Sequence, residues 1–394
     1  MTRYRFADCE LDTATRELRR DGIVRPQEPQ VFDLLAFLAA NPDRVVERDE
    51  LVEVVWGGRI VSDATIASRL AAARRAVGDD GTRQAVIRTV HRRGVRLVVR
   101  PSRVEPEPAH AKGAGAGVRF CRGHGGVRLA WTVAGEGPPL LRVGHWLTHL
   151  QHDAASPIWR PFLAELHHAF RLVRYDQRAN GLSERGVADL SLAAFVGDLA
   201  AVADAAGLER FPIYATSQGV PVALAYAARH PERVTRLVLH GGYVRGRLIR
   251  SDVAREEGEA YLALMRHGWG LAGSQFLQAF ASIFLPDGTP EQLRSLVELQ
   301  RVSASVEDAV RLRRAFDGFD VSRFVPAVMA RTLVMHGRDD AVHPLEESTA
   351  LTEALRAAEL VVLDTRNHVL TTHDPAWPVF FDALTRFCRD AEGG

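Results

Sequence analysis

The chain has 394 residues, of which 46% are hydrophobic and 25% are charged, and its formal net charge at pH 7 is +1. This is the composition of a globular protein, and the length leaves room for two domains with their own cores. Three cysteines without metal-ligand spacing, and no apolar stretch near 18 residues, exclude a disulfide scaffold and a membrane span. We therefore expect a cytoplasmic protein that uses no metal and no other cofactor.

The first hundred residues show the pattern of a small mixed domain. Short strands are predicted at residues 4–7 and 16–20, with a hairpin turn at Asp21-Gly22. Three helices and a basic hairpin follow. The helices are expected at 29–40, 47–56 and 64–77, and the hairpin at 85–99. Ser62 and Asp63 can cap the third helix, whose apolar stripe faces the core.

The order of these elements resembles the winged helix-turn-helix effector domain of the OmpR/PhoB type. The matching residues include Asp21-Gly22, Phe32, Leu35, Asn41-Pro42, Leu51, Val55-Trp56-Gly57 and Ile87-Arg88-Thr89-Val90. Val95 stands where that family often has tyrosine. The resemblance implies that the third helix enters the major groove of duplex DNA and that the hairpin, or wing, contacts the minor groove.

Positive charge is concentrated in this part of the chain. Residues 69–100 contain nine arginines and two aspartates, a net charge of +7. Such a local surplus suits phosphate contacts, although a solvated basic face is the alternative interpretation. On the resemblance, the candidate DNA-binding residues are Ser68, Arg69, Arg74, Arg75, Arg88, Thr89, His91, Arg92 and Arg93. We also expect a homodimer, because domains of this type often bind repeated half-sites.

A segment rich in proline, alanine and glycine follows, without hydrophobic periodicity. We therefore expect a first domain over residues 1–100, a linker over 101–117 and a second domain over 118–394.

The second domain contains a serine in a sharp strand-to-helix turn. The residues Ala215-Thr216-Ser217-Gln218-Gly219 lie between a predicted strand and a run of helix-forming residues. This pattern is typical of a nucleophile elbow, in which the turn exposes the serine hydroxyl and directs the next N–H at a substrate oxyanion. Ser217 is therefore the candidate nucleophile and Gln218 a candidate oxyanion donor. A chance turn that contains a serine is the alternative.

Two later strands end in polar loops, where open α/β sheets place their sites. Asp340 follows the strand at 331–336, and His368 follows the strand at 360–363. Because an activated serine needs a base and an orienting acid, in the order Ser, acid, His in this fold class, we assign His368 and Asp340 these roles. Asp339 is the second candidate for the acid. His336 and His343 are lesser candidates, expected to pack or to be solvated.

Two more loops support this interpretation. Gly144-His145-Trp146 follows a predicted strand at 138–143, at the place that commonly supplies a second oxyanion donor, and we assign that N–H to Trp146. The loop at 176–183 resembles a D-x-R-G-x-G-x-S motif, with Ala179 in place of its first glycine. We expect its Asp176 and Arg178 to brace turns.

Residues 118–391 thus resemble the α/β-hydrolase family. The resemblance implies a mostly parallel eight-stranded sheet with a helical cap at about 245–325, and a serine hydrolase active on an ester or lactone.

Three functions are compatible with these two domains. The first is a one-component bacterial transcription regulator, which lies at the nucleoid when it is bound to DNA. Its hydrolase-like domain senses a small apolar ester, lactone or acyl ligand, and this domain can also hydrolyse the ligand. The second is an esterase-like serine hydrolase whose winged helix serves placement or assembly. In the third, the winged helix makes only protein contacts. Fusion to a DNA-binding domain favours the first function, because an enzyme does not need to bind an operator sequence in DNA.

Overall fold

The computed structural model describes residues 3–13, 17–20, 23–25, 27–42, 44–57, 61–90, 93–99, 101–104, 117–269 and 274–389. The chain divides into two compact units, Met1–Gly113 and Ala114–Gly394.

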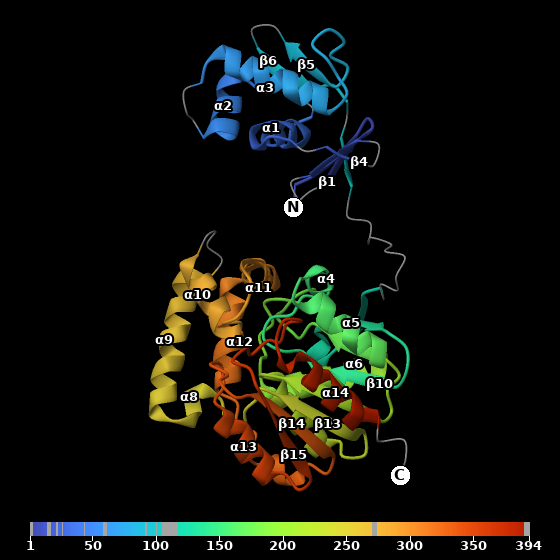
Figure 1. Cartoon of the computed structure of the whole chain (residues 1–394), viewed down its shortest axis with the longest axis vertical. Helices are drawn as coiled ribbons and strands as arrows, with labels where there is room; N and C mark the ends of the chain where they lie inside the picture. Colours follow the sequence, from blue (N-terminus) through green and yellow to red (C-terminus); the bar gives the residue numbers. More distant parts are fainter. Residues whose placement is uncertain are drawn as a thin grey trace. The chain divides into compact units, whose positions relative to one another are not determined.

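The N-terminal unit combines an antiparallel sheet with three helices and a two-stranded wing (Figure 1). The sheet has the order β4-β3-β2-β1-β7, and the wing pairs β5 with β6. The strands are Arg3–Phe6 (β1), Cys9–Asp12 (β2), Glu17–Arg20 (β3), Ile23–Arg25 (β4), Ile87–Val90 (β5), Gly94–Leu97 (β6) and Ser102–Val104 (β7). The sequence did not predict β2. The expected turn at Asp21-Gly22 lies outside the described residues, between the paired strands β3 and β4.

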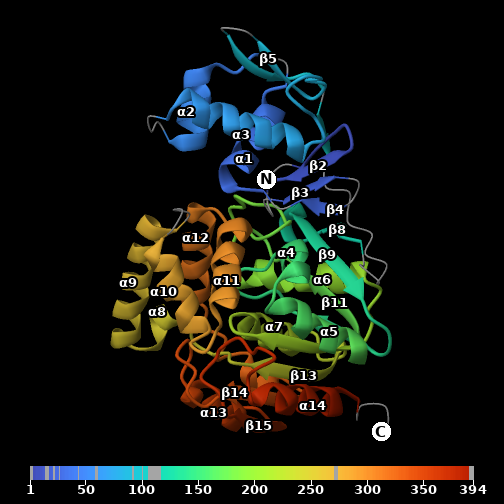
Figure 2. The ribbon, with the colours of Figure 1, turned by 45° about the horizontal axis from the view of Figure 1, so that its top comes forward.

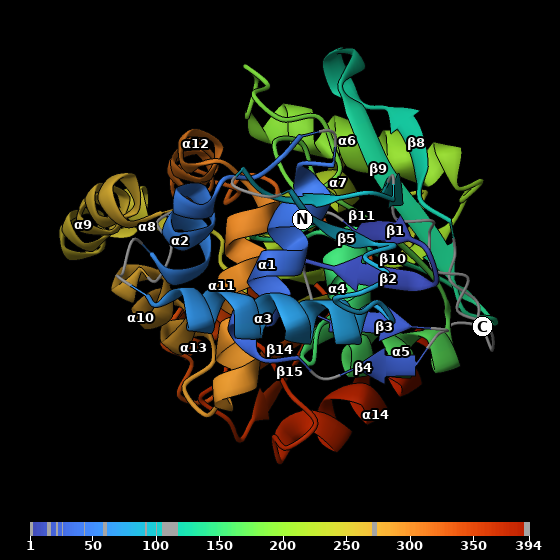
Figure 3. The ribbon, with the colours of Figure 1, turned by 90° about the horizontal axis from the view of Figure 1, so that it is seen from above.

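The helices of this unit are Pro29–Ala40 (α1), Arg48–Trp56 (α2) and Asp63–Ala76 (α3). Figure 3 shows α1 running across α3, and their apolar faces meet in a common core that includes Leu34, Leu35, Ile66 and Leu70. Ser62 caps α3 by accepting a hydrogen bond of 3.2 Å from the N–H of Thr65. The predicted winged helix-turn-helix is thus confirmed.

The linker begins later in the chain than the composition suggested. Residues 102–104 form β7, which pairs antiparallel with β1 and places Ser102 opposite Arg5. A strand at this position needs a partner almost a hundred residues away, which local composition does not reveal. Residues 105–116 lie outside the described part of the chain.

The C-terminal unit is built on an eight-stranded sheet of order β15-β14-β13-β12-β10-β11-β9-β8. Its strands are Arg119–Arg122 (β8), Arg128–Ala134 (β9), Pro139–Arg142 (β10), Arg171–Tyr175 (β11), Phe211–Thr216 (β12), Val234–His240 (β13), Arg331–Gly337 (β14) and Ala358–Leu363 (β15). The pairs from β11 through β10 to β15 are parallel, and only β9 and β8 run antiparallel to their neighbours. The predicted mostly parallel sheet is therefore confirmed.

Helices cover both faces of this sheet (Figure 3). Trp159–Ala169 (α5) and Ala376–Arg389 (α14) share one face, where the rings of Phe162 and Phe381 lie 5.0 Å apart. Leu192–Ala205 (α6) and Gly219–Arg229 (α7) contact one another on the other face. Strands covered on both faces must be apolar along their length, which explains the continuous apolar runs of β12 and β13.

The helical cap lies between β13 and β14, as the resemblance implied. Figure 2 shows its long helices side by side. They are Arg247–Arg250 (α8), Asp252–Gly268 (α9), Gln275–Phe284 (α10), Pro290–Ser303 (α11) and Val306–Asp317 (α12). The remaining helices are Leu150–Ala155 (α4), after β10, and Leu345–Ala354 (α13), after β14.

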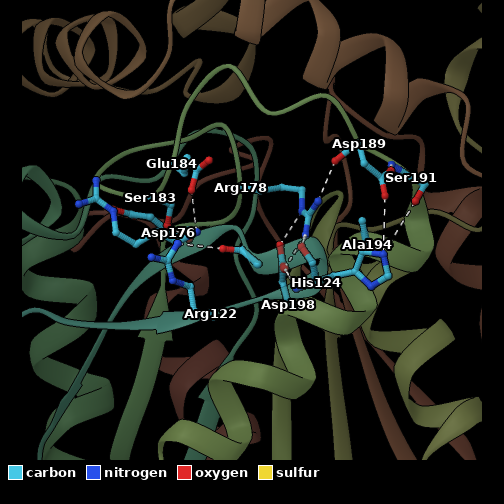
Figure 4. A network of polar contacts seen from close by, with 12 residues as sticks. Arg122, His124, Asp176, Arg178, Ser183, Glu184, Asp189, Ser191, Ala194 and Asp198 are labelled. Atoms are coloured by element: carbon cyan, nitrogen blue, oxygen red, sulfur yellow. Dashed lines mark hydrogen bonds and ion pairs between the residues drawn. The ribbon is translucent and has the colours of Figure 1, made fainter.

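A buried ion pair holds the loop that follows β11 (Figure 4). Arg178 donates to both carboxylate oxygens of Asp198 on α6, at 2.7 and 2.6 Å, and also to the carbonyls of Asp189 and His124. Asp176 accepts the N–H groups of Leu150 and Leu182. Both side chains thus brace turns. Ala179, in place of the motif's glycine, has a φ of 62°, a conformation that alanine rarely adopts.

No helix in the described ranges is long and apolar enough to cross a membrane. Within the same ranges, no cluster of three or more His, Cys, Asp or Glu side chains could hold a metal ion.

Candidate functional site

Ser217 occupies the turn between β12 and α7 in a strained conformation. Its φ is 54°, in the left-handed region that residues with a side chain rarely adopt, and its N–H donates to the carbonyl of His240 at 2.9 Å. Gly219 must be small, because a Cβ there would lie 3.0 Å from the carbonyl oxygen of Gly144. The turn therefore has the geometry of a nucleophile elbow, in which strain is stored at a functional position.

Asp340 and His368 meet at the ends of β14 and β15. Nδ1 of His368 lies 2.6 Å from Oδ2 of Asp340, and the other carboxylate oxygen accepts the N–H of Val342 at 2.8 Å. Burial raises the pKa of Asp340, but the charge and hydrogen bond of His368 outweigh it, so the net shift is downward. Asp339 is exposed. Of the two aspartates considered from the sequence, the structure pairs Asp340 with the histidine.

Nε2 of His368 is buried and has no hydrogen-bond partner among the described residues. Ser217 and His368 line the same cavity, but no hydrogen bond joins them. Gly241 leaves room for the imidazole, because a Cβ at that position would lie 3.0 Å from Cε1 of His368. His368 is thus oriented by Asp340 and lines the same cavity as Ser217.

This cavity has a volume of about 40 Å³ and an almost wholly apolar wall. Its lining comes from α5, β12 and the cap helices α10 and α11, and includes Trp159, Phe162, Tyr214, Phe280, Phe284, Leu296 and Leu299. The carbonyl of Phe284 accepts the N–H of His368 at 3.0 Å, so the end of α10 is tied to the loop that carries the base. A small apolar group fits this space.

Trp146 and Gln218, the candidate oxyanion donors, both lie beside Ser217. Neither N–H is taken up by a hydrogen bond within the described part of the chain. Leu147, next to Trp146, has a φ of 43°, so this loop is also strained.

A buried arginine holds this loop, and the sequence did not reveal it. Arg142 at the end of β10 lies 3.0 Å from Nε2 of His145, and Nδ1 of His145 lies 3.0 Å from the carbonyl oxygen of Trp146. Because arginine can only donate, Nε2 of His145 accepts, and its proton sits on Nδ1 and is donated to Trp146. Gln177 also donates to the carbonyl of His145. These bonds orient the peptide unit next to the candidate oxyanion donor.

Arg142 has an unusual environment for a cation. Its guanidinium lies 4.8 Å from the ring centroid of Trp159 and 5.3 Å from that of Phe162. Burial lowers the pKa of Arg142, while the charge of Asp153 opposes this shift. The residues immediately around Arg142 could not be recognised from the sequence, because they come from separate elements.

The two lesser histidine candidates are both buried. His336 lies 2.6 Å from the hydroxyl of Ser348 and 2.9 Å from the carbonyl of His343, so it packs within the fold. The ring of His343 lies 5.7 Å from that of His368. His240, which had no predicted role, lines the apolar cavity, and burial lowers its pKa to about 3.

In the N-terminal unit, two of the candidate DNA contacts have partners within the unit itself. Arg74 is buried; it donates to the carbonyl of Ile87 at 3.0 Å and to the hydroxyl of Thr89 at 2.8 Å, and thus joins α3 to the wing. Arg69 is half-buried and bonds Glu28 and Gln30 at the start of α1. Helical spacing did not show these partners, because it does not reveal where a long side chain folds back.

Four other candidates are exposed: Ser68, Arg75, Arg88 and Arg93. Thr89 is exposed as well, with its hydroxyl engaged by Arg74. His91 and Arg92 lie outside the described residues. Arg96, which was counted in the basic segment but not proposed as a contact, is exposed on β6. The open basic surface of this unit therefore consists of fewer arginines than the sequence suggested.

Comparison with known families agrees with this architecture. A family model described as the alpha/beta hydrolase fold matches residues 153–371, more than half of the chain. The chain belongs to this family. A second model, described as the C-terminal part of transcriptional regulatory proteins, matches residues 26–97. The α/β hydrolase is thus joined to a winged-helix DNA-binding domain of the OmpR/PhoB type.

Several relatives and solved structures that resemble this α/β hydrolase carry hydrolase names. A putative carbamate hydrolase RutD from Azorhizobium caulinodans is 27% identical over 276 residues, covering 68% of this chain and 98% of the relative. An esterase from Exiguobacterium antarcticum has a TM-score of 0.58 at 20% identity, covering 68% of this chain and 98% of the esterase. The enol-lactonase from Burkholderia xenovorans LB400 has a TM-score of 0.54 at 22% identity, with coverages of 70% and 100%. At these identities the structural likeness shows the fold alone.

Proposed function

We propose that this protein is a one-component transcription regulator whose α/β-hydrolase domain binds and hydrolyses a small ester or lactone with an apolar acyl group. The observation that carries the proposal is that His368, oriented by Asp340, lines the same apolar cavity as the strained Ser217, in a chain that also contains a DNA-binding domain. A pocket that only binds a ligand needs no such alignment of serine, histidine and aspartate.

In the proposed reaction, His368 takes the proton of the Ser217 hydroxyl as its oxygen attacks the ester carbonyl. Asp340 stabilises the imidazolium that forms, and the N–H groups of Trp146 and Gln218 bind the oxyanion. The C–O bond to the alcohol then breaks, and His368 returns its proton to the departing oxygen. A water molecule, activated by the same histidine, hydrolyses the acyl-enzyme.

The size of the cavity argues for a short acyl group. A volume of about 40 Å³ holds only a few water-sized groups. The Ser217–His368 hydrogen bond is not formed in this structure, and catalytic hydrogen bonds often tighten only when the substrate is bound. We infer that ligand binding brings the Ser217 and His368 side chains together, and that the protein senses the ligand through this movement.

The regulator would act in the bacterial cytoplasm, at the nucleoid, as two copies on repeated half-sites. Its exposed Arg75, Arg88 and Arg93 would contact phosphates.

Two measurements on the full-length protein test the proposal. A serine-directed fluorophosphonate should label the wild type and not Ser217→Ala. An electrophoretic shift should show that the protein binds the DNA upstream of its own gene. In the Ser217→Ala variant, a short-chain ester should change the affinity for this DNA. Absence of labelling would contradict the hydrolase part, and binding no tighter than to random DNA would contradict the regulator part.

One observation favours the second candidate, a serine hydrolase whose winged helix serves placement or assembly. Arg69 and Arg74 are engaged inside the N-terminal unit, which leaves fewer free charges for phosphates than the sequence suggested. Labelling at Ser217 together with no preference for the upstream DNA would support this candidate.

A further inference from the structure

A second, smaller cavity lies beside Ser217, and its walls differ from those of the apolar one. Its volume is about 10 Å³, and its lining includes Ser217, Gln218, His343, Arg313 and Asp317. Trp146, Ser217 and Phe284 line both cavities. An ester carbonyl at Ser217 would therefore adjoin both an apolar cavity and a second cavity that contains charged side chains.

The buried guanidinium group of Arg313 lines the smaller cavity, and that of Arg247 contacts the same aromatic ring, Tyr261. Arg313 on α12 is 6% exposed and donates from Nε to Asp317 at 2.6 Å. Arg247 on α8 is 8% exposed and donates to the carbonyl of Val342. The ring of Tyr261 on α9 lies 5.0 Å from the guanidinium of Arg247 and 5.9 Å from that of Arg313. In the described part of the chain, no carboxylate lies within 4.0 Å of Arg247. Arg313 thus has a carboxylate partner, and Arg247 has none within this distance among the described residues.

The surrounding groups do not supply the missing negative charge. Arg250 on α8 is matched by Glu347 on α13, at 3.2 Å. His343 adds no charge, because burial lowers its pKa well below the usual range, and the charges of His368, Arg250 and Arg247 lower it further. Burial also lowers the pKa of Arg247, with Arg313 as the next contributor. The cluster formed by Arg247, Arg250, Arg313, Asp317 and Glu347 has a net charge of +1.

A buried charge without a partner is unfavourable by several kcal/mol unless a counter-charge is brought to it. Of this cluster, Arg313 and Asp317 line the cavity beside Ser217, where the reacting group of a substrate would sit. Arg313 reaches the cavity wall, and its terminal nitrogens have no hydrogen-bond partner among the described residues.

We propose that the ligand carries a carboxylate on the leaving-group side of its ester or lactone bond and that Arg313 binds this carboxylate. The apolar acyl group occupies the larger cavity. This inference rests on the proposed function and narrows its substrate class. Because about 10 Å³ holds only about one water molecule, the smaller cavity must widen when the ligand binds.

The reaction requires no further reactant. Ser217 attacks the carbonyl, the C–O bond to the leaving group breaks, and the leaving hydroxycarboxylate takes the proton held by His368. Its carboxylate stays ionised on Arg313 throughout. Water then releases the short acyl group as a second acid.

A pair of esters that differ in charge tests the proposal. Butyryloxyacetate carries the carboxylate, and its methyl ester does not. The wild type should hydrolyse butyryloxyacetate with a kcat/KM about 10- to 100-fold above that for the methyl ester, the range of a hydrogen bond to a charged group. Arg313→Gln should lower the value for the anion at least tenfold more than the value for the neutral ester. Arg314→Gln is the matched control, because Arg314 is the next residue on α12 and bonds the exposed Glu259.

Because Arg313→Gln leaves Asp317 unpaired, the double variant Arg313→Gln/Asp317→Asn should be tested as well. It removes both charges and should show the same loss of preference. A preference for the anion that survives in both variants would overturn the proposal, and so would equal values for the two esters in the wild type.

A binding measurement separates this proposal from the proposed hydrolase. In Ser217→Ala, butyryloxyacetate should raise the Tm, the methyl ester should raise it less, and Arg313→Gln should remove the difference. This result together with no hydrolysis by the wild type would support the anion site and contradict the hydrolase. Equal shifts from the two esters would contradict the anion site, whatever the activity of the protein.

Discussion

Arginine serves different purposes in the two units of this protein. In the winged helix, most of the arginines that the structure describes in the basic segment are exposed, whereas Arg74 is buried and joins α3 to the wing. In the hydrolase unit, arginines such as Arg142, Arg178 and Arg313 are buried, and each is oriented by one or more specific partners. A count of charges along the chain treats all of these residues alike. The comparison teaches that the partner of an arginine, and not its position in a basic segment, decides whether it supports folding, catalysis or DNA binding.

The largest effect is expected for the buried pair Arg178–Asp198. Arg178→Met should lower the free energy of unfolding of the hydrolase unit by about 3–5 kcal/mol, because Asp198 would remain buried without a counter-charge. Urea unfolding followed by tryptophan fluorescence measures this. Arg178→Met/Asp198→Asn should recover part of the loss. If the free energy of unfolding of Arg178→Met falls by less than about 1 kcal/mol, water must reach Asp198. Buried and exposed arginines would then differ less in their contribution to stability.

Substitution of Arg142 should lower activity much more than stability. Arg142→Met removes a buried cation that has no close carboxylate, so the free energy of unfolding should fall by no more than about 1 kcal/mol. It also removes the bond that sets the tautomer of His145, so kcat should fall about 10- to 100-fold with little change in KM, as expected for misplacement of an oxyanion donor. Steady-state kinetics on butyryloxyacetate measure the effect. A change in KM alone would mean that Arg142 acts on substrate binding.

Arg74 tests whether a basic residue of the DNA-binding unit is structural. Arg74→Met should destabilise the N-terminal unit by about 1–3 kcal/mol, because the carbonyl of Ile87 would lose its donor. Hydrogen exchange in residues 87–90 of the full chain should become faster. Unchanged exchange with a flatter salt dependence of DNA binding would instead assign Arg74 to a phosphate contact.

The smallest effects on stability are expected for the exposed arginines. Arg75→Ala and Arg93→Ala should change the free energy of unfolding by less than about 0.5 kcal/mol. Each should lower the slope of log affinity against log salt by about 0.9 if it neutralises one phosphate. Arg69→Ala is the control, because Glu28 already pairs with it. A larger slope change for Arg69 than for Arg75 would reverse the assignment of the DNA-facing side of α3.

The sequence by itself determined the elements and motifs that depend on neighbouring residues. Hydrophobic periodicity predicted α1 over residues 29–40 as the structure has it, and the serine turn after β12 was recognised from its five residues. The order of Ser217, Asp340 and His368 was also predictable, because the carboxyl ends of parallel strands meet at one edge of a sheet. Local propensity and chain order are sufficient for such predictions.

The tertiary structure decided the features that depend on contacts between distant residues. The pairing of β7 with β1, the choice of Asp340 over Asp339, and the inward turn of Arg69 and Arg74 each require partners from other elements. The same is true of the Arg142–His145 bond and of the guanidinium cluster around Arg313. A long, flexible side chain can reach solvent or any of several partners from one backbone position, so only the packing of the surrounding elements selects its environment.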